Sequence, residues 1–128
     1  EYSMESMYNN VAVEYFDLQA YDEALRTLEL ARTVNPLKAE ISWNIGTVQL
    51  VVGRYADAVA SYQEAIRLKS GYLEAYLKLG EAYFGLGQTG EAIQATQEVL
   101  RSNPRHVQAL VNLRRFESAI PNPRSPIR

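Results

Sequence analysis

Amide side chains that recur at a fixed interval are the residues of this sequence best suited to chemistry. Asn10 and Asn44 lie 34 residues apart, and Lys78 and Asn112 follow at the same interval. An Asn amide both donates and accepts hydrogen bonds, and the backbone of an extended peptide offers partners for both. A row of such amides can therefore hold an extended peptide. The alternative is that each amide is simply solvated, although Asn is a poor residue inside a helix.

Groups that could carry out catalysis are scarce. Cysteine is absent, which excludes a Cys/His set and a thiolate metal site. The sequence supports no Ser/His/Asp set around His106, the only histidine. We expect His106 to be an exposed loop residue. The acidic residues Glu23, Asp57 and Glu91 recur in the first turn of a predicted helix, where the helix dipole accounts for them. The glycines form no phosphate-binding motif. The sequence predicts no enzyme, no cofactor and no metal.

The 34-residue interval also organises the helices that must position these side chains. Within residues 55–66, apolar residues fall at the spacing of one stripe on an amphipathic helix. Gly46 recurs as Gly80, and Gly53 recurs as Gly87. Two helices per fixed interval are the mark of a stacked helical repeat. We expect helices over residues 5–18, 22–34, 39–52, 55–68, 73–86, 89–101 and 107–119.

Local signals predict how these helices begin, end and pack. Ser3 and Thr89 are expected N-caps, and Gly53 is expected to supply a left-handed turn after its helix. Gly46 and Gly80 are expected to let paired helices approach to roughly 8–10 Å, facing small residues of the second helix. Those small residues are Ala24, Ala58 and Ala92.

Three copies of one pattern run in register without an insertion. They carry Tyr8, Val11, Ala12, Tyr15, Tyr21, Ala24, Ala31 and Pro36 in the first copy, Ile45, Gly46, Gly53, Tyr55, Ala58, Tyr62 and Ala65 in the second, and Tyr76, Leu79, Gly80, Tyr83, Gly87, Ala92 and Pro104 in the third. This pattern resembles the tetratricopeptide repeat. Gln19 stands where that family usually has Gly, and Leu28 and Thr96 stand where it usually has an aromatic residue.

The resemblance implies an all-α fold, a right-handed superhelical α-solenoid of three helix-turn-helix hairpins plus a capping helix. The implied divisions are a lead-in over residues 1–4, repeats over 5–38, 39–72 and 73–106, a capping helix over 107–120 and a Pro-rich tail over 121–128. Arg114 takes the place of a small residue in the last helix. We therefore expect Arg114 and Arg115 to be solvated on the open side of the cap.

In the family that this chain resembles, the first helix of each repeat lines a concave groove. Trp43 stands one place later than the usual large residue, which turns its indole about 100° around the helix, toward the groove. Trp43 is therefore the expected anchor for a partner, with packing against the neighbouring repeat as the alternative. The apolar residues Phe16, Leu50 and Val51 also fall at groove positions. The candidate binding residues are Asn9, Asn10, Val13, Trp43, Asn44, Thr47, Leu77, Lys78, Glu81, Phe84 and Asn112.

These features predict an adaptor or scaffold module that binds a partner protein through an extended or helical peptide with apolar and some basic or polar side chains. A chaperone's acidic tail is disfavoured, because of the five positions that clamp such tails in the family only Asn44 fits, with Lys78 a partial match. The five positions hold Asn9, Val13, Asn44, Glu74 and Lys78. The alternative is a self-associating scaffold, a homo-oligomer in which the capping helix and tail contact a neighbouring copy.

Composition sets outer bounds on these functions. The chain has 128 residues and a net charge of -2, which suggests neither nucleic acid nor an anionic membrane as a partner. No apolar run approaches the roughly 20 residues that span a bilayer, so membrane insertion is not expected. The chain begins at Glu1 without Met, and we expect an excised segment or a processed form. The compartment stays open, with the cytoplasm as the default expectation.

Overall fold

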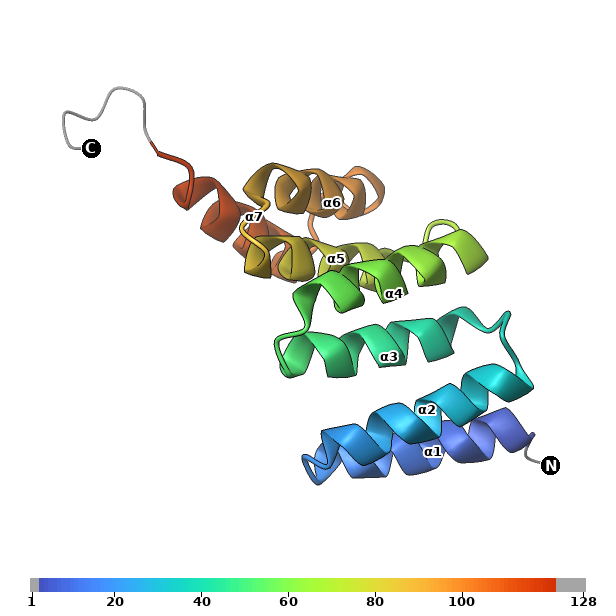
Figure 1. The fold of residues 1–128 in the computed structure, drawn as a ribbon. Helices are drawn as coiled ribbons and strands as arrows, with labels where there is room; N and C mark the ends of the chain where they lie inside the picture. The colour runs from blue at the N-terminus through green and yellow to red at the C-terminus, as the bar shows by residue number, and fades with distance from the viewer. Residues whose placement is uncertain (1–2, 122–128) are drawn as a thin grey trace.

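Seven helices make up residues 3–121, the part of the chain that the computed structural model describes, and this part contains no strand (Figure 1). This arrangement confirms the all-α prediction. The helices are α1 (Met4–Asp17), α2 (Tyr21–Val34), α3 (Ala39–Val51), α4 (Tyr55–Leu68), α5 (Leu73–Gly85), α6 (Thr89–Ser102) and α7 (Val107–Ser118).

The helix ends agree with most of the expected signals. Ser3 caps α1, since its hydroxyl accepts a hydrogen bond from the Ser6 amide at 3.3 Å. Gly53 has the expected left-handed backbone, with φ of 85°, and Gln19 adopts the same conformation at the corresponding turn, with φ of 62°. The prediction for Thr89 was wrong. Thr89 is the first residue inside α6, and Gln88 precedes it without a side-chain hydrogen bond.

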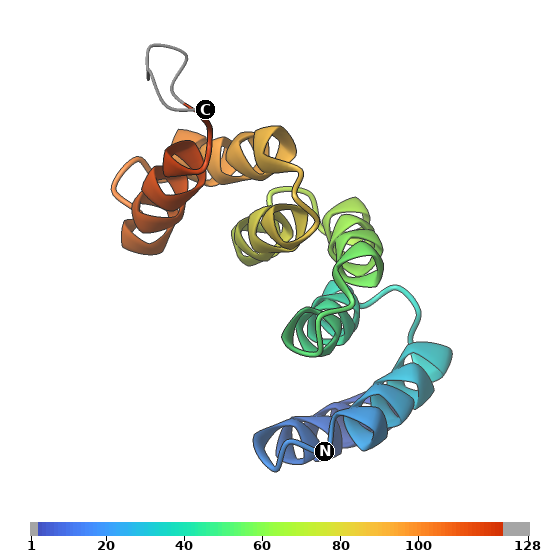
Figure 2. The ribbon, with the colours of Figure 1, turned by 60° about the vertical axis from the view of Figure 1, so that its left-hand side comes forward.

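Consecutive helices pack in pairs, and the pairs stack into a curved array. The pairs are α1 with α2, α3 with α4, and α5 with α6, while α7 covers the end of the stack against α6 and α5. In Figure 2 the pairs follow an arc with α3, α5 and α7 on its inner side and α4 and α6 on its outer side. We call the inner surface, formed by α1, α3, α5 and α7, the inner face. The fold is an all-α helical repeat solenoid.

The stack is tighter at its C-terminal end than at its N-terminal end. Helix α3 touches α5 and α5 touches α7, whereas the corresponding approach of α1 to α3 is weaker. Helix α2 also packs less extensively on α3 than α4 does on α5. Figure 2 shows the same difference as a wider opening between the first pair and the second.

The core is divided among the interfaces between helices rather than gathered at one centre. One cluster joins α1, α2 and α3, a second joins α4, α5 and α6, and a third lies where α3 and α4 meet the start of α5. Each cluster draws on neighbouring pairs only, which is how repeat arrays are stabilised. None of the seven helices in residues 3–121 is long and apolar enough to cross a bilayer.

Two glycines allow the paired helices to approach closely. A Cβ atom on Gly80 would lie 2.9 Å from the Thr96 hydroxyl oxygen and 3.2 Å from the Ala92 carbonyl oxygen, so Gly80 faces Ala92 as expected. A Cβ atom on Gly46 would lie 2.9 Å from the ring of Tyr62. The ring of Tyr62 on the paired helix therefore lies closest to Gly46.

The last helix ends the array with one exposed side. Arg114 is exposed as expected, while Phe116 is fully buried against α5. Arg115 is exposed too, but its guanidinium lies 5.4 Å from the ring centroid of Phe84, so it is not simply solvated. Residues 1–2 and 122–128 fall outside the described residues, and with them nearly all of the expected Pro-rich tail.

Substituting two helical glycines should separate packing from helix propensity. Gly80→Ala should lower the free energy of unfolding by about 1–3 kcal/mol, because the added methyl group meets backbone and a buried side chain. Gly90→Ala meets no atom within 4 Å, and it should raise stability by up to about 1 kcal/mol. Urea unfolding followed by circular dichroism measures both effects. Equal stabilisation by the two substitutions would contradict the close approach at Gly80.

Candidate functional site

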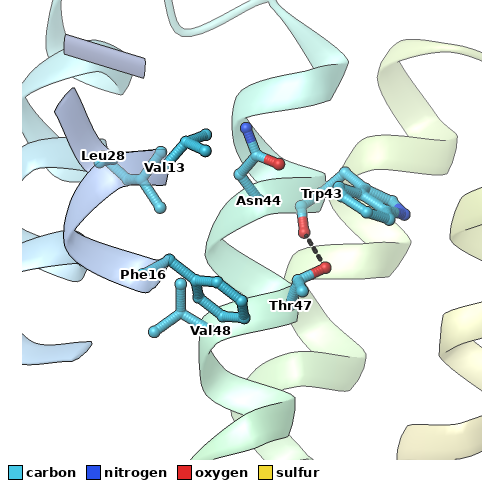
Figure 3. Close-up of a pocket in the computed structure, with 8 residues that line it drawn as sticks. Val13, Phe16, Leu28, Trp43, Asn44, Thr47 and Val48 are labelled. Carbon is cyan, nitrogen blue, oxygen red and sulfur yellow. Dashed lines mark hydrogen bonds between the residues drawn. The ribbon is translucent and has the colours of Figure 1, made fainter. Parts of the chain in front are cut away.

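An apolar pocket of about 230 Å³ lies between the first two helix pairs, which pack on each other less extensively than the later pairs do (Figure 3). Its floor is formed by buried apolar side chains from three helices, Ala12 of α1, Leu28 of α2 and Val48 of α3. Because α2 lies behind this floor, the pocket belongs to the inner face. The walls and rim are Val13 and Phe16 of α1 and Trp43, Asn44 and Thr47 of α3.

The short side chain of Leu28 explains why this pocket exists. Leu28 occupies the place in α2 that Tyr62 occupies in α4, one 34-residue interval later. The Tyr62 ring is fully buried, and its hydroxyl reaches Thr47 on the paired helix. Leu28 packs in the same direction but ends before it can fill the equivalent volume. Ala12, Leu28 and Val48 were not among the candidate binding residues. The signal for them was the aliphatic Leu28 at an aromatic position.

A chain of hydrogen bonds stiffens the α3 wall of the pocket. The Thr47 hydroxyl donates to the Trp43 carbonyl oxygen at 2.9 Å, which uses its single proton (Figure 3). The Tyr62 hydroxyl, 2.9 Å from the Thr47 oxygen, must then be the donor in that pair. Burial raises the pKa of Tyr62 far above its ordinary value of 10.

The recurring amides make contacts between helix pairs. The Asn44 amide nitrogen donates to the Asn9 side-chain oxygen at 2.6 Å and so ties α3 to α1 at the rim of the pocket. Asn112 accepts from Gln108 at 2.9 Å and donates to the Glu81 carboxylate at 3.4 Å. Because Asn112 is only 1% exposed, the expectation of an open amide there is corrected. Asn10 is exposed on α1 and does not line the pocket.

Trp43 contacts both the pocket and the core between the second and third helix pairs. Its indole is turned away from Val13 and Phe16 in Figure 3, and it packs against the clusters that join the second and third helix pairs. Its Nε1 atom is buried there without a hydrogen-bond partner among the described residues. Trp43 is nevertheless one of the residues that line the pocket. The register shift seen in the sequence therefore places most of the ring between repeats.

The remaining candidate residues lie farther along the inner face, near α5 and α7. Lys78 and Glu81 form an ion pair with 4.0 Å between Nζ and Oε1, and Glu81 also accepts from Asn112. Phe84 stacks on Phe116 with 4.7 Å between ring centroids. Leu77, Lys78, Glu81 and Phe84 are each partly buried on α5. This group is separate from the pocket, and Asn10 belongs to neither.

His106 has a structural position rather than the expected one in an exposed loop. It is half-buried at the N-cap of α7, where its Nδ1 atom accepts a hydrogen bond from the Ala109 amide at 3.2 Å. An N-cap needs an acceptor of this kind for the first unpaired amides of a helix. Among residues 3–121, no group of three or more His, Asp or Glu side chains could hold a metal ion.

Comparisons with known proteins agree with the repeat architecture. Family models described as tetratricopeptide repeat match residues 12–72 and residues 52–119. Superkiller complex protein 3 of Mus musculus is 29% identical over 93 residues, which cover 67% of this chain. The chain spans only 6% of the length of that relative.

Solved structures of similar fold include domains bound to peptides. The first tetratricopeptide repeat domain of Spaghetti (RPAP3), bound to the HSP90 peptide SRMEEVD, has a TM-score of 0.87 and 24% identity. The match covers 90% of this chain and 91% of that one. The second tetratricopeptide repeat domain of human RPAP3, in complex with the HSP70 peptide SGPTIEEVD, has a TM-score of 0.85 and 23% identity. The match covers 89% of this chain and 96% of that one. At these identities the likeness establishes the fold.

Removing the hydroxyl of Tyr62 should change stability in opposite directions at two pH values. At neutral pH, Tyr62→Phe should lower the free energy of unfolding by about 1 kcal/mol, because the hydrogen bond with Thr47 is lost. The folded pKa lies above the unfolded value of 10, so the wild type is destabilised as the pH rises past 10. This loss approaches about 1.4 kcal/mol per pH unit, and the Phe variant lacks it. Urea unfolding of both proteins across this range measures the gap between them, and a constant gap would contradict the prediction.

Proposed function

The chain belongs to the tetratricopeptide repeat family, a family of protein-interaction modules, and we propose that its inner face binds a peptide segment of a partner protein. The observation that carries this proposal is the apolar pocket between α1 and α3. A solvated surface rarely keeps a hollow with a floor made only of Ala, Leu and Val side chains. Val13, at its edge, is 45% exposed and would be covered by a bound segment.

The rim of the pocket suits a peptide backbone. Asn9 and Asn44 are both partly exposed, and their amides are held together by one hydrogen bond. Each Asn amide has two donors and an acceptor with two lone pairs, so one shared bond leaves further capacity on both. A segment that places an apolar side chain in the pocket would bring its own backbone to this pair.

The charges near the inner face favour a neutral or basic segment over an acidic tail. Of the five positions that clamp acidic tails in the family, only one holds a lysine in this chain. That residue is Lys78, and it forms an ion pair with Glu81. Glu74 is exposed one turn before Lys78 on α5. An acidic peptide would therefore meet a carboxylate and a lysine that is already neutralised. We expect this chain to bind neither of the acidic peptides that are bound to its structural neighbours.

Two matched substitutions test where a partner binds. Random peptides displayed on phage are selected against the chain, and the affinities of the enriched peptides are measured by calorimetry. Val13→Glu should weaken binding about tenfold or more, because it places a charge at the mouth of an apolar pocket. Leu30→Glu is the control, since Leu30 is 51% exposed on α2 and does not line the pocket. It should change affinity by less than about twofold.

The proposal has two ways to fail. Selected peptides that bind Val13→Glu as tightly as the wild type would place their site outside the pocket. A selection that enriches no peptide would remove peptide binding by this chain altogether. Circular dichroism of both variants shows whether weak binding results from loss of folding.

A further inference from the structure

Three equivalent places along the stack lie between successive inner helices, and two of them contain an aromatic ring. The residues that can reach each place are one from the second helix of a pair and one from the first helix of the next pair. At the first place these are Leu28 and Val48, at the second Tyr62 and Ala82, and at the third Thr96 and Phe116, each set one 34-residue interval after the last.

At the second place the ring comes from within the repeat. Tyr62 is fully buried, and a Cβ atom on Gly46 would lie 2.9 Å from its ring. Ala82 belongs to the same cluster and is small enough to leave room for the ring. A large side chain from α4 is therefore matched by a small one from α5.

At the third place the ring comes from the following helix. Thr96 is short, and Phe116 of α7 is fully buried there, with its ring 3.6 Å from a Cβ atom built on Gly80. The ring of Phe116 stacks on Phe84 of α5, with 4.7 Å between centroids. The pairing of large with small is reversed, but the place is filled again.

At the first place neither contributor is aromatic. Leu28 and Val48 are both buried, and together they leave the pocket of about 230 Å³. The pocket is lined by Ala12, the counterpart of Gly46 and Gly80, and by Phe16, the counterpart of Phe84. The environment that holds a ring from one of the two contributors at the other places is therefore present here, but neither Leu28 nor Val48 supplies a ring.

We propose that a partner segment inserts a phenylalanine side chain into this pocket, where its ring stacks on Phe16 as Phe116 stacks on Phe84. This inference rests on the proposed peptide-binding function and specifies the residue that the partner must supply. The occupant is a neutral or basic peptide of another protein. The segment 121–128 of this chain, PNPRSPIR, contains no aromatic residue and does not meet the requirement.

The chemistry of the floor favours phenylalanine over tyrosine. In the second place the Tyr62 hydroxyl bonds to Thr47, but the counterpart of Thr47 on α1 is Val13. A hydroxyl pushed down to Ala12, Leu28 and Val48 would meet only apolar side chains, and an unpaired buried hydroxyl is unfavourable. An aliphatic side chain would bury less area and could not stack on Phe16.

Charges at both ends of the pocket support basic residues beside the phenylalanine. Asp17 lies one turn beyond Val13 on α1, and Glu40 lies one turn before Asn44 on α3, and both are exposed. Lys69 lies 3.6 Å from Glu40 and offsets part of that charge. A segment with Lys or Arg near its phenylalanine is therefore complementary to both helices, mainly at low salt.

Two variants fill the pocket from opposite sides and test the inference. Ala12→Gly with Leu28→Tyr reproduces the Gly46 and Tyr62 arrangement, and Val48→Phe reproduces the contribution of Phe116. Val107→Phe is the matched control, since it adds the same ring at a position that is 73% exposed. The probes are the phage-selected peptides, together with versions in which each Phe is replaced by Tyr or Leu. Thermal melting confirms that each variant is folded.

We expect the selected peptides to share one phenylalanine, and either filled variant to weaken their binding about tenfold or more, since the ring loses its buried site. Replacing that phenylalanine by tyrosine should weaken binding to the wild type about tenfold. Val107→Phe should leave affinity unchanged.

Other outcomes are distinguishable. Peptides that depend on Val13 but share no phenylalanine, or that bind both filled variants as well as the wild type, would overturn this inference and leave the proposed function intact. Enrichment of sequences like PNPRSPIR would overturn it in favour of self-association. The absence of any peptide that depends on Val13 would overturn both.

Discussion

Stacking of each helix pair on the next is the interaction on which the rest of this structure depends. No pair closes a core of its own, because the buried residues form clusters that each span more than one pair. Large side chains at these junctions are matched by small ones across the interface, as Tyr62 is by Ala82 and Phe116 by Thr96. The spacing of the inner helices follows from how completely each junction is filled.

Seen in this way, the pocket is a local underfilling of a regular array. At the first junction the two contributors are Leu28 and Val48. The second junction has an aromatic residue from the earlier helix pair and a small residue from the later helices, and the third junction has the reverse. The consequence extends beyond the pocket, because α2 packs less on α3 than α4 does on α5. The proposed binding region is thus also the region where successive helix pairs pack least extensively. The hydrogen bond between Asn44 and Asn9 is one of the contacts that still connects α1 with α3.

The polar residues of the inner face carry a double role for the same reason. Asn44 and Asn112 sit at equivalent positions, and both bond back to the preceding inner helix. Where the helices are close, as at α5 and α7, Asn112 is buried by that contact. Where the helices are farther apart, as at α1 and α3, Asn44 and Asn9 stay partly exposed. One residue type is structural at one end of the array and accessible at the other.

The sequence by itself determined the helices, their order and the family. Apolar spacing and turn residues are local signals, and they recur in each repeat at the 34-residue interval. Through the family resemblance the sequence also assigned Val13, Asn44 and Thr47 to the inner face, and the structure shows that these three line one pocket. Only the tertiary structure decided which of these residues are open and which are used internally. The indole of Trp43 is packed between repeats and Asn112 is buried, since both depend on the distance between helices that are not adjacent in the chain. The pocket floor at Leu28 and Val48 likewise arises from two side-chain volumes that meet only after the pairs have stacked.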